Sequence, residues 1–157
     1  VVGQLGIDKF SLLGADNQQA IISKLLFEIA VPFDQLGELS QRVSEVISNC
    51  LEDDRGRWVL SNNHSNSAFE HPISGLVEGQ IIRCRLDRTF IENGIRWIID
   101  YKSSDYEGTE PTQFLAVEKQ RNQYATLMSQ LESLPIKLGL YYPVAQAWID
   151  WDYRKNS

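Results

Sequence analysis

Apolar residues recur at helical spacing through the first third of the chain. The first stripe consists of Ile21, Ile22, Leu25, Leu26 and Ile29. The second consists of Leu36, Leu39, Val43, Val46, Ile47 and Cys50. Asp16, with Gln19 completing a capping box, and Asp34 precede these stripes and are typical helix N-caps. The pattern therefore predicts structural helices over about 16–29 and 34–51.

The pattern changes after Trp58, where a polar segment gives way to stretches rich in Ile, Val, Phe and Trp. The predicted elements are strands at about 69–78, 80–92 and 95–102, a helix at about 113–134, and strands at about 137–142 and 146–153. Pro135 marks the end of the long helix. This order predicts an α/β (α+β) fold in which a mixed central sheet is flanked by helices.

The change of pattern also suggests how the chain is organised. We expect one compact domain, with an N-terminal helical segment at 1–53 and a core at 54–157. The sequence begins Val1-Val2 without an initiator Met, and we interpret it as a piece of a larger protein.

Composition and charge narrow the class of protein. The 157 residues carry a net charge of -6, so any contact with nucleic acid must be local or shared with other domains. Cys50 and Cys84 are too few for a four-cysteine metal site, and they do not suggest a secreted disulfide scaffold. No apolar run approaches the length of a membrane span, and no signal peptide is apparent. These features predict a cytoplasmic protein without a membrane partner.

The strongest local signal is Asn93-Gly94, a pair typical of a two-residue type I′ hairpin turn. With that turn, the strand register places Asp87 directly opposite Asp100 on one face of the hairpin. Lys102 lies two residues beyond Asp100, so strand alternation places it on the same face. The sequence therefore predicts a cluster of two aspartates and one lysine.

Opposed carboxylates repel each other, and a divalent cation would reverse that effect. Two carboxylates with a nearby backbone carbonyl are typical ligands of Mg²⁺ or Mn²⁺. Such a site could activate water and stabilise charge on a phosphate, with the lysine ammonium assisting. The alternative is an exposed hairpin face on which Lys102 simply neutralises one aspartate, and a β-bulge that broke the register would favour it.

The long predicted helix adds a second signal. Its apolar stripe consists of Val117, Tyr124, Leu127, Leu131 and Leu134, with Gln120 among them. A glutamine on a buried stripe needs a hydrogen-bond partner, so Gln120, one turn before Tyr124, is expected to face a polar group. The alternative is that Gln120 lies at the edge of the stripe and contacts water.

Taken together, these segments resemble the RecB-like nucleases of the PD-(D/E)XK superfamily, found at the C-terminus of UvrD/Rep-type helicase–nucleases (exonuclease V beta subunit-like). The matching segments are RCRLDRTF (83–90), RWIIDYKSS (96–104), QRNQY (120–124) and LGLYYP (138–143). The lead-in is similar at GRWVLS (56–61) and FEHP (69–72). The similarity extends over about residues 50–153.

The resemblance implies a restriction-endonuclease-like core and cleavage of DNA phosphodiesters that depends on Mg²⁺ (or Mn²⁺). Asp87 and Asp100 match the metal-binding carboxylates, and the backbone carbonyl of Tyr101 would be a further ligand. Lys102 matches the catalytic lysine. The positions that match the motif for positioning DNA are Gln120 and Tyr124.

The chain departs from the family at one point, because its members usually carry a G-x-x-x-H helix before the sheet. His64 lies in a polar loop and His71 precedes Pro72 in an extended setting, so neither matches that histidine. We infer that the histidine helix lies upstream or is absent, which puts the activity of this piece in doubt. Glu70 is a tentative substitute ligand, although an exposed position at a strand end is its ordinary interpretation.

We therefore expect a nuclease domain of an ATP-dependent helicase–exonuclease that acts in DNA end processing and recombinational repair. Its partners would be DNA, upstream helicase domains and a second nuclease or helicase subunit. One alternative is a catalytically inactive module that keeps the nuclease fold to bind DNA or dock a partner subunit. Another is a stand-alone restriction-type endonuclease, which fits less well because no segment is left over for target recognition. Aromatic residues of the last strands could stack on bases, although packing is the simpler use.

Overall fold

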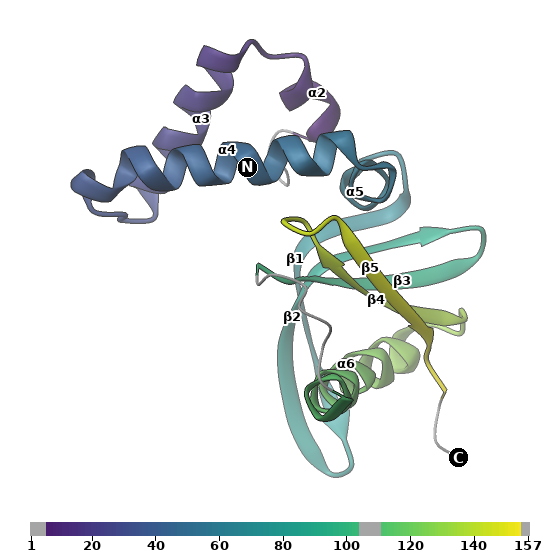
Figure 1. Ribbon diagram of the computed structural model, residues 1–157. Helices are drawn as coiled ribbons and strands as arrows, with labels where there is room; N and C mark the ends of the chain where they lie inside the picture. The colour runs from purple at the N-terminus through teal and green to yellow at the C-terminus, as the bar shows by residue number, and fades with distance from the viewer. Residues whose placement is uncertain (1–5, 104–110, 155–157) are drawn as a thin grey trace. The chain divides into compact units, whose positions relative to one another are not determined.

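A computed structural model describes the chain over residues 6–103 and 111–154. The chain packs as two compact units, Val1–Asn62 and Asn63–Ser157. The first unit is helical and the second contains the whole β-sheet, as Figure 1 shows. The expected mixed α/β architecture is therefore present, with the helical part and the sheet in separate units.

The N-terminal unit consists of short and medium helices. They are α2 (Ile7–Ser11), α3 (Ala15–Glu28), the 3-10 turn η1 (Phe33–Gln35), α4 (Leu36–Glu52) and α5 (Asp54–Leu60). Between α3 and α4, Ile22 is fully buried and the hydroxyl of buried Ser40 contacts Ser23 Oγ at 2.9 Å. Two predicted helices are thus confirmed.

The helix ends differ from the sequence-based expectation. Gly14, not Asp16, is the N-cap of α3, and no side chain caps that helix. Gln19 does not close a capping box, because its side chain donates to Ser40 Oγ across the helix pair at 2.5 Å. The side chain of Asp53 does cap a helix, accepting from the backbone of Gly56 at 3.1 Å at the start of α5.

This cap explains why the unit boundary differs from the one expected after residue 53. Asp53 starts a new helix, α5, which packs against α4 and stays with the helical unit. The division between the units therefore falls after Asn62, just before the first strand.

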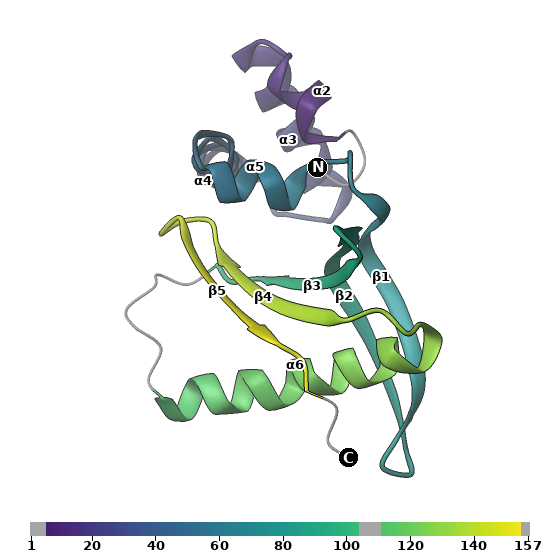
Figure 2. The ribbon, with the colours of Figure 1, turned by 90° about the vertical axis from the view of Figure 1, so that its right-hand side faces the viewer.

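The second unit is built on one five-stranded mixed sheet. Its elements are β1 (Ser65–Val77), β2 (Gln80–Glu92), β3 (Ile95–Tyr101), α6 (Pro111–Leu131), β4 (Ile136–Tyr142) and β5 (Ala147–Asp152). Among the described strands, the spatial order equals the chain order, and β3–β4 is the one parallel pair. Helix α6 makes the crossover between these two parallel strands and lies along one side of the sheet (Figure 2).

The β2–β3 hairpin has the register that its turn residues predict. Asn93 and Gly94 have φ angles of 51° and 74°, as a type I′ turn requires. Phe90 pairs with Trp97 in the resulting ladder. The ladder continues to the pair Arg88 and Ile99 without a register shift. The next residues along the two strands are Asp87 and Asp100.

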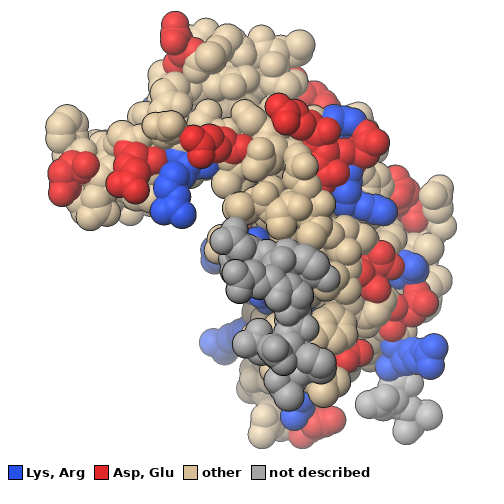
Figure 3. Space-filling view, viewed as in Figure 1, with Lys and Arg blue, Asp and Glu red and all other residues tan. Residues whose placement is uncertain are grey.

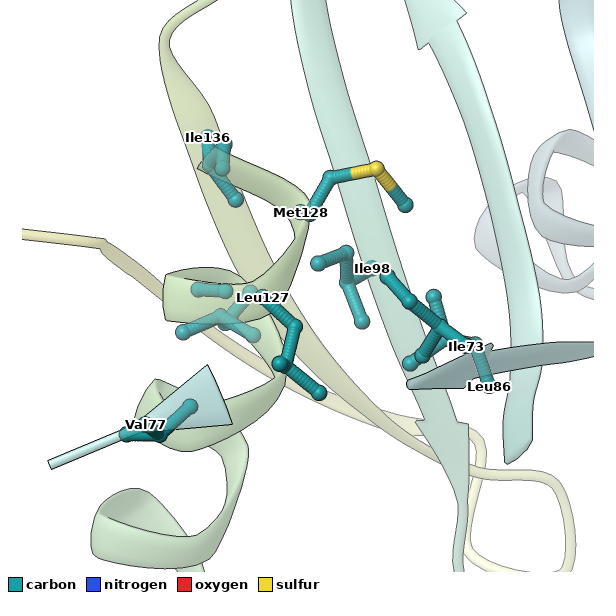
Figure 4. Close-up of a cluster of buried hydrophobic side chains, with 9 residues drawn as sticks. Ile73, Val77, Leu86, Ile98, Leu127, Met128 and Ile136 are labelled. Atoms are coloured by element: carbon teal, nitrogen blue, oxygen red, sulfur yellow. The ribbon is translucent and has the colours of Figure 1, made fainter. Parts of the chain in front are cut away.

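The hydrophobic core of this unit lies between α6 and the sheet (Figure 4). Its buried members are Ile73, Val77, Leu86, Ile98, Ala125, Leu127, Met128, Ile136 and Leu138. They come from β1, β2, β3, β4 and α6, so the helix packs across most of the sheet. This packing decides which side of α6 faces the strands.

Two ion pairs join β3 to α6 and to the residue that follows this helix. At the start of the strand, Arg96 donates from Nε and Nη2 to the two carboxylate oxygens of Glu132, at 2.6 and 2.9 Å. At the other end of the strand, Asp100 Oδ1 lies 2.8 Å from Nη2 of Arg121. Ile98, between the two strand residues, is buried in the core. The helix is therefore held against β3 by Arg121 within it and by Glu132 directly after its last residue.

Within the described residues, the structure contains no helix with the length and hydrophobicity to cross a membrane.

Candidate active site

The carboxyl end of β3 brings the two predicted aspartates together. Asp87 Oδ2 accepts a hydrogen bond from the backbone N–H of Tyr101 at 3.1 Å, so its carboxyl group lies against the residue that follows Asp100. Asp100 lies close enough to Asp87 for its negative charge to contribute to the raised pKa of the Asp87 carboxyl group. The hairpin register thus produces the close pair of acids that it predicts.

Lys102 completes the predicted cluster. Its Nζ lies 2.7 Å from Asp100 Oδ2. The backbone N–H of Lys102 donates to the carbonyl of Tyr141 in β4 at 2.9 Å, which holds the lysine beside the end of the sheet. Tyr101, whose carbonyl is the predicted additional metal ligand, lies between Asp100 and Lys102 in the chain.

Arg121 is a fourth member of the cluster that the sequence analysis did not identify. Its Nη2 lies 2.8 Å from Asp100 Oδ1, and its side chain is only 12% exposed. The guanidinium group also lies over the ring of Tyr124, 4.9 Å from the ring centroid. Each oxygen of Asp100 therefore faces a different cation, one from the residue directly after β3 and one from α6.

The spacing of apolar residues along the helix could have identified Arg121 from the sequence. Buried or half-buried residues of α6 include Phe114, Val117, Tyr124, Ala125 and Met128, and Arg121 lies between them at three- and four-residue intervals. An arginine inside such a stripe needs an anionic partner, which Asp100 provides.

Gln120 lies at the edge of the stripe, as the second interpretation of this helix expects, because its side chain is exposed. The apolar stripe passes through Arg121 instead, and the predicted end of the stripe differs too. Leu131 is exposed, and Leu134 lies beyond the end of α6. Tyr124 is half-buried and packs against the core. The reason is tertiary: packing against β1 and β4 sets the rotation of α6 about its axis.

The environment of the cluster shifts the pKa of Asp87. Burial raises the pKa of this carboxyl group to about 6, and nearby Asp100 adds to the rise, while the N–H of Tyr101 and the charge of Arg121 lower it. Burial also raises the pKa of Tyr124 and of the Cys84 thiol, both of which lie near Arg121. The cluster therefore lies in a region that is poorly accessible to water.

Glu70 and the two histidines lie outside this cluster. Glu70 has a φ of 50°, and its side chain, about two-thirds exposed, forms an ion pair with Arg85 at 3.7 Å. The ring of His64 stacks on Phe90 with centroids 3.8 Å apart, and His71 lies within β1. Across residues 6–103 and 111–154, the structure contains no group of three or more His, Cys, Asp or Glu side chains that could hold a metal ion.

Arg88, next to Asp87, is a structural residue. It is fully buried, donates to Ser67 Oγ at 2.6 Å, and lies over the rings of Phe69 and Phe90. Burial lowers the pKa of its guanidinium group to about 10, which leaves it charged at neutral pH. This arginine joins β1 to β2 beside the cluster.

Comparisons with known proteins add little to this description. No family model matches the chain, and no curated protein matches it. One similar solved structure is titled "Crystal structure of SSO0001", with 19% sequence identity and a TM-score of 0.44. The match covers 88% of this chain and 62% of the other, so the chain spans less than two thirds of that protein's length.

Proposed function

We propose that this chain carries the site of a metal-dependent DNA nuclease. The observation that supports the proposal most strongly is the pairing of Asp87 with Asp100 at the end of β3, with Nζ of Lys102 at 2.7 Å from Asp100. Two adjacent half-buried or buried carboxylates destabilise a fold unless cations balance them. In a site that cleaves phosphodiesters, the carboxylates would bind a metal ion and the lysine would offset negative charge on the phosphate.

The residues fit a divalent cation chemically. Asp100 Oδ2 is buried, and its partner within the described residues is the ammonium group of Lys102 at 2.7 Å. An oxygen of this kind, together with Asp87 and the carbonyl of Tyr101, makes the hard oxygen donor set that Mg²⁺ or Mn²⁺ prefers. When bound, the cation would lower the pKa of a water molecule and offset negative charge on the phosphate.

The protein's own groups would act around that chemistry. Asp87 and Asp100 would hold the cation in a fixed position, because β2 and β3 hold both carboxylates rigidly. The ammonium group of Lys102 would position the attacking water or offset charge as the phosphate becomes more negative in the transition state. Gln120 and Tyr124, on the adjacent helix, remain the residues proposed to position DNA.

We extend the proposal to the whole protein on the resemblance of its motifs. The chain would be the PD-(D/E)XK, RecB-like nuclease domain of a cytoplasmic ATP-dependent helicase–exonuclease that works in DNA end processing and recombinational repair. The mixed sheet with a crossover helix is consistent with a restriction-endonuclease-like core. Its partners would be DNA, the upstream helicase domains and a second subunit.

The distribution of surface charge restricts how DNA would be held. On the described part of the face in Figure 3, Lys and Arg side chains are interspersed with Asp and Glu rather than gathered into one basic patch. The net charge of the chain is -6. We therefore propose that DNA contact is local to the site, with the helicase domains supplying most of the affinity.

The experiment that tests this function is cleavage of end-labelled linear DNA by the 157-residue chain with Mg²⁺, with Mn²⁺ or with chelator. We expect cleavage only with the metal ions, and a loss of at least about a hundredfold in Lys102→Met, since it removes an electrostatic group at the reacting phosphate. The matched control for this substitution is Lys119→Met, at an exposed position on α6. For substitutions of aspartate the control is Asp152→Asn, because Asp152 is an exposed carboxylate on β5 that pairs with Lys137.

Binding of Mn²⁺ is measured in parallel by thermal unfolding. A ligand at about 100 times its Kd stabilises the native state by about 2.7 kcal/mol, which is a visible increase in Tm. Asp87→Asn should lose that increase and Asp152→Asn should keep it. Wild-type protein that neither cuts DNA nor responds to metal would refute the nuclease proposal.

A second candidate is an inactive nuclease-fold module that binds DNA or docks a partner subunit. The observation that favours it is the neutralisation of Asp100 by Lys102 and Arg121, which balances the carboxylate without any metal. The same assays separate the two functions. An inactive module would show no Mn²⁺-dependent stabilisation and no cleavage, yet would retain DNA or partner binding in the presence of chelator.

A further inference from the structure

Arg121 occupies a position from which it competes with a metal ion. It approaches Asp100 from α6, whereas Lys102 approaches the same carboxylate from the end of β3. The two contacts, at 2.8 and 2.7 Å, use one oxygen each. A cation that binds Asp100 must therefore share or displace one of these two partners.

The charges of the cluster favour displacement of a positively charged partner of Asp100 when a divalent cation binds. Asp87 and Asp100 carry two negative charges when ionised, and Lys102 and Arg121 carry two positive charges. A divalent cation added to this balanced set is repelled by both neighbouring cations. Without Arg121, the same set has a net negative charge and attracts the cation.

The guanidinium group of Arg121 also has unused hydrogen-bonding capacity. Its Nε is buried and has no hydrogen-bond partner within the described residues. Its side chain is mostly buried, and its position over the Tyr124 ring keeps it at the site. An arginine released from its carboxylate in such a place would require another anion, because an unpaired buried charge is costly.

We propose that Arg121 exchanges partners during function: it holds Asp100 in the metal-free protein, gives up that carboxylate when a divalent cation binds, and then binds a DNA phosphate. The inference rests on the proposed nuclease function and adds a role that the sequence motifs did not assign. A planar guanidinium suits this exchange, since its donors match carboxylate and phosphate oxygens alike. Metal binding and DNA binding are then thermodynamically linked through one side chain.

The first test measures Mn²⁺ binding to the whole chain by electron paramagnetic resonance, which needs no catalytic turnover. Arg121→Gln removes the competing charge and is expected to lower the Kd for Mn²⁺ about tenfold. Arg121→Lys, which keeps a positive charge, should stay near the wild-type value. The matched control is Lys119→Gln, which removes the same charge from an exposed position on α6.

The second test adds a phosphorothioate DNA oligonucleotide, which resists hydrolysis. In the wild type, the oligonucleotide should lower the Kd for Mn²⁺ several-fold, and Mn²⁺ should tighten oligonucleotide binding by the same factor. In Arg121→Gln this mutual effect should disappear. Lys119→Gln should retain it, apart from a small uniform loss of DNA affinity.

The outcomes separate this inference from the proposed function. If wild-type protein binds Mn²⁺ and Arg121→Gln binds it equally or more weakly, the partner exchange is refuted and the nuclease site stands. If neither protein binds Mn²⁺, the proposed metal site is refuted and the exchange with it. A misfolded Arg121→Gln variant would bind Mn²⁺ more weakly, so misfolding cannot explain tighter binding. Arg121→Lys changes the same side chain but keeps its positive charge, so it separates the effect of charge from the effect of the substitution itself.

Discussion

Asp100 of β3 and Arg121 of α6 form an ion pair with a 2.8 Å separation, and both side chains are nearly buried. The pair joins the end of a central strand to the helix that crosses over the sheet. It also changes the electrostatic role of Asp100. In the hairpin alone, Asp100 would repel Asp87 and pair with Lys102, whereas in the folded unit it also pairs with Arg121.

This relationship predicts opposite effects for the two aspartates in metal-free protein. Asp100→Asn should destabilise the chain by about 3 kcal/mol, since it leaves the buried Arg121 unpaired. Asp87→Asn should increase stability, because it removes the charge whose burial raises the pKa of that group. The measurement is urea unfolding with chelator, with Asp152→Asn as the control. Equal effects of the two substitutions would contradict the geometry described.

The pKa of Asp87 predicts a pH dependence of stability in chelator. Its pKa is about 6 in the folded protein and near 3.9 in an unfolded chain. The folded state therefore binds more protons between these values, so the contribution of Asp87 favours folding most at low pH and is lost as pH rises through about 6. Comparing wild type with Asp87→Asn between pH 4 and 7 isolates this contribution. The stability difference between them should grow with pH and level off above the folded pKa; a constant difference would contradict it.

The ion pair between Arg96 of β3 and Glu132, directly after α6, should contribute at least as much to the stability of the fold. Arg96, 6% exposed, makes a two-point contact with Glu132 and also donates to the carbonyl of Asn66 at 3.1 Å. Glu132→Gln should destabilise the protein by about 3 kcal/mol, because it leaves a buried guanidinium without its carboxylate. A double-mutant cycle with Arg96→Met measures the coupling, and additive effects would show that the pair does not interact in solution.

Gly139 in β4 is predicted to tolerate no side chain. A Cβ at this position would overlap Cη2 of Trp148 on the neighbouring strand. Gly139→Ala should therefore cost about 1–3 kcal/mol of stability through overpacking. Trp148→Leu in the same chain should recover part of the loss, as judged by the free energy of unfolding. A destabilisation of the same size in both backgrounds would mean that the indole is not the obstacle.

Much of the second unit was predictable from local chemistry. Asn93-Gly94 selects a tight turn because both residues adopt positive φ, and a tight turn determines the register of the strands on either side. The pairing of Phe90 with Trp97 and the approach of Asp87 to Asp100 follow from that register. The strand positions followed from stretches rich in Ile, Val, Phe and Trp, residue types that favour a half-buried pleated strand.

The sequence by itself therefore determined the strands, the hairpin register and the pairing of two aspartates with a lysine, since each depends on residues close in the chain. The tertiary structure decided the rotation of α6, and with it the exposure of Gln120 and the insertion of Arg121 beside Asp100. Helical periodicity permits neighbouring stripes that differ by one residue, and only packing against the sheet selects between them. This rotation of α6 places the charge of Arg121, rather than the neutral side chain of Gln120, beside Asp100.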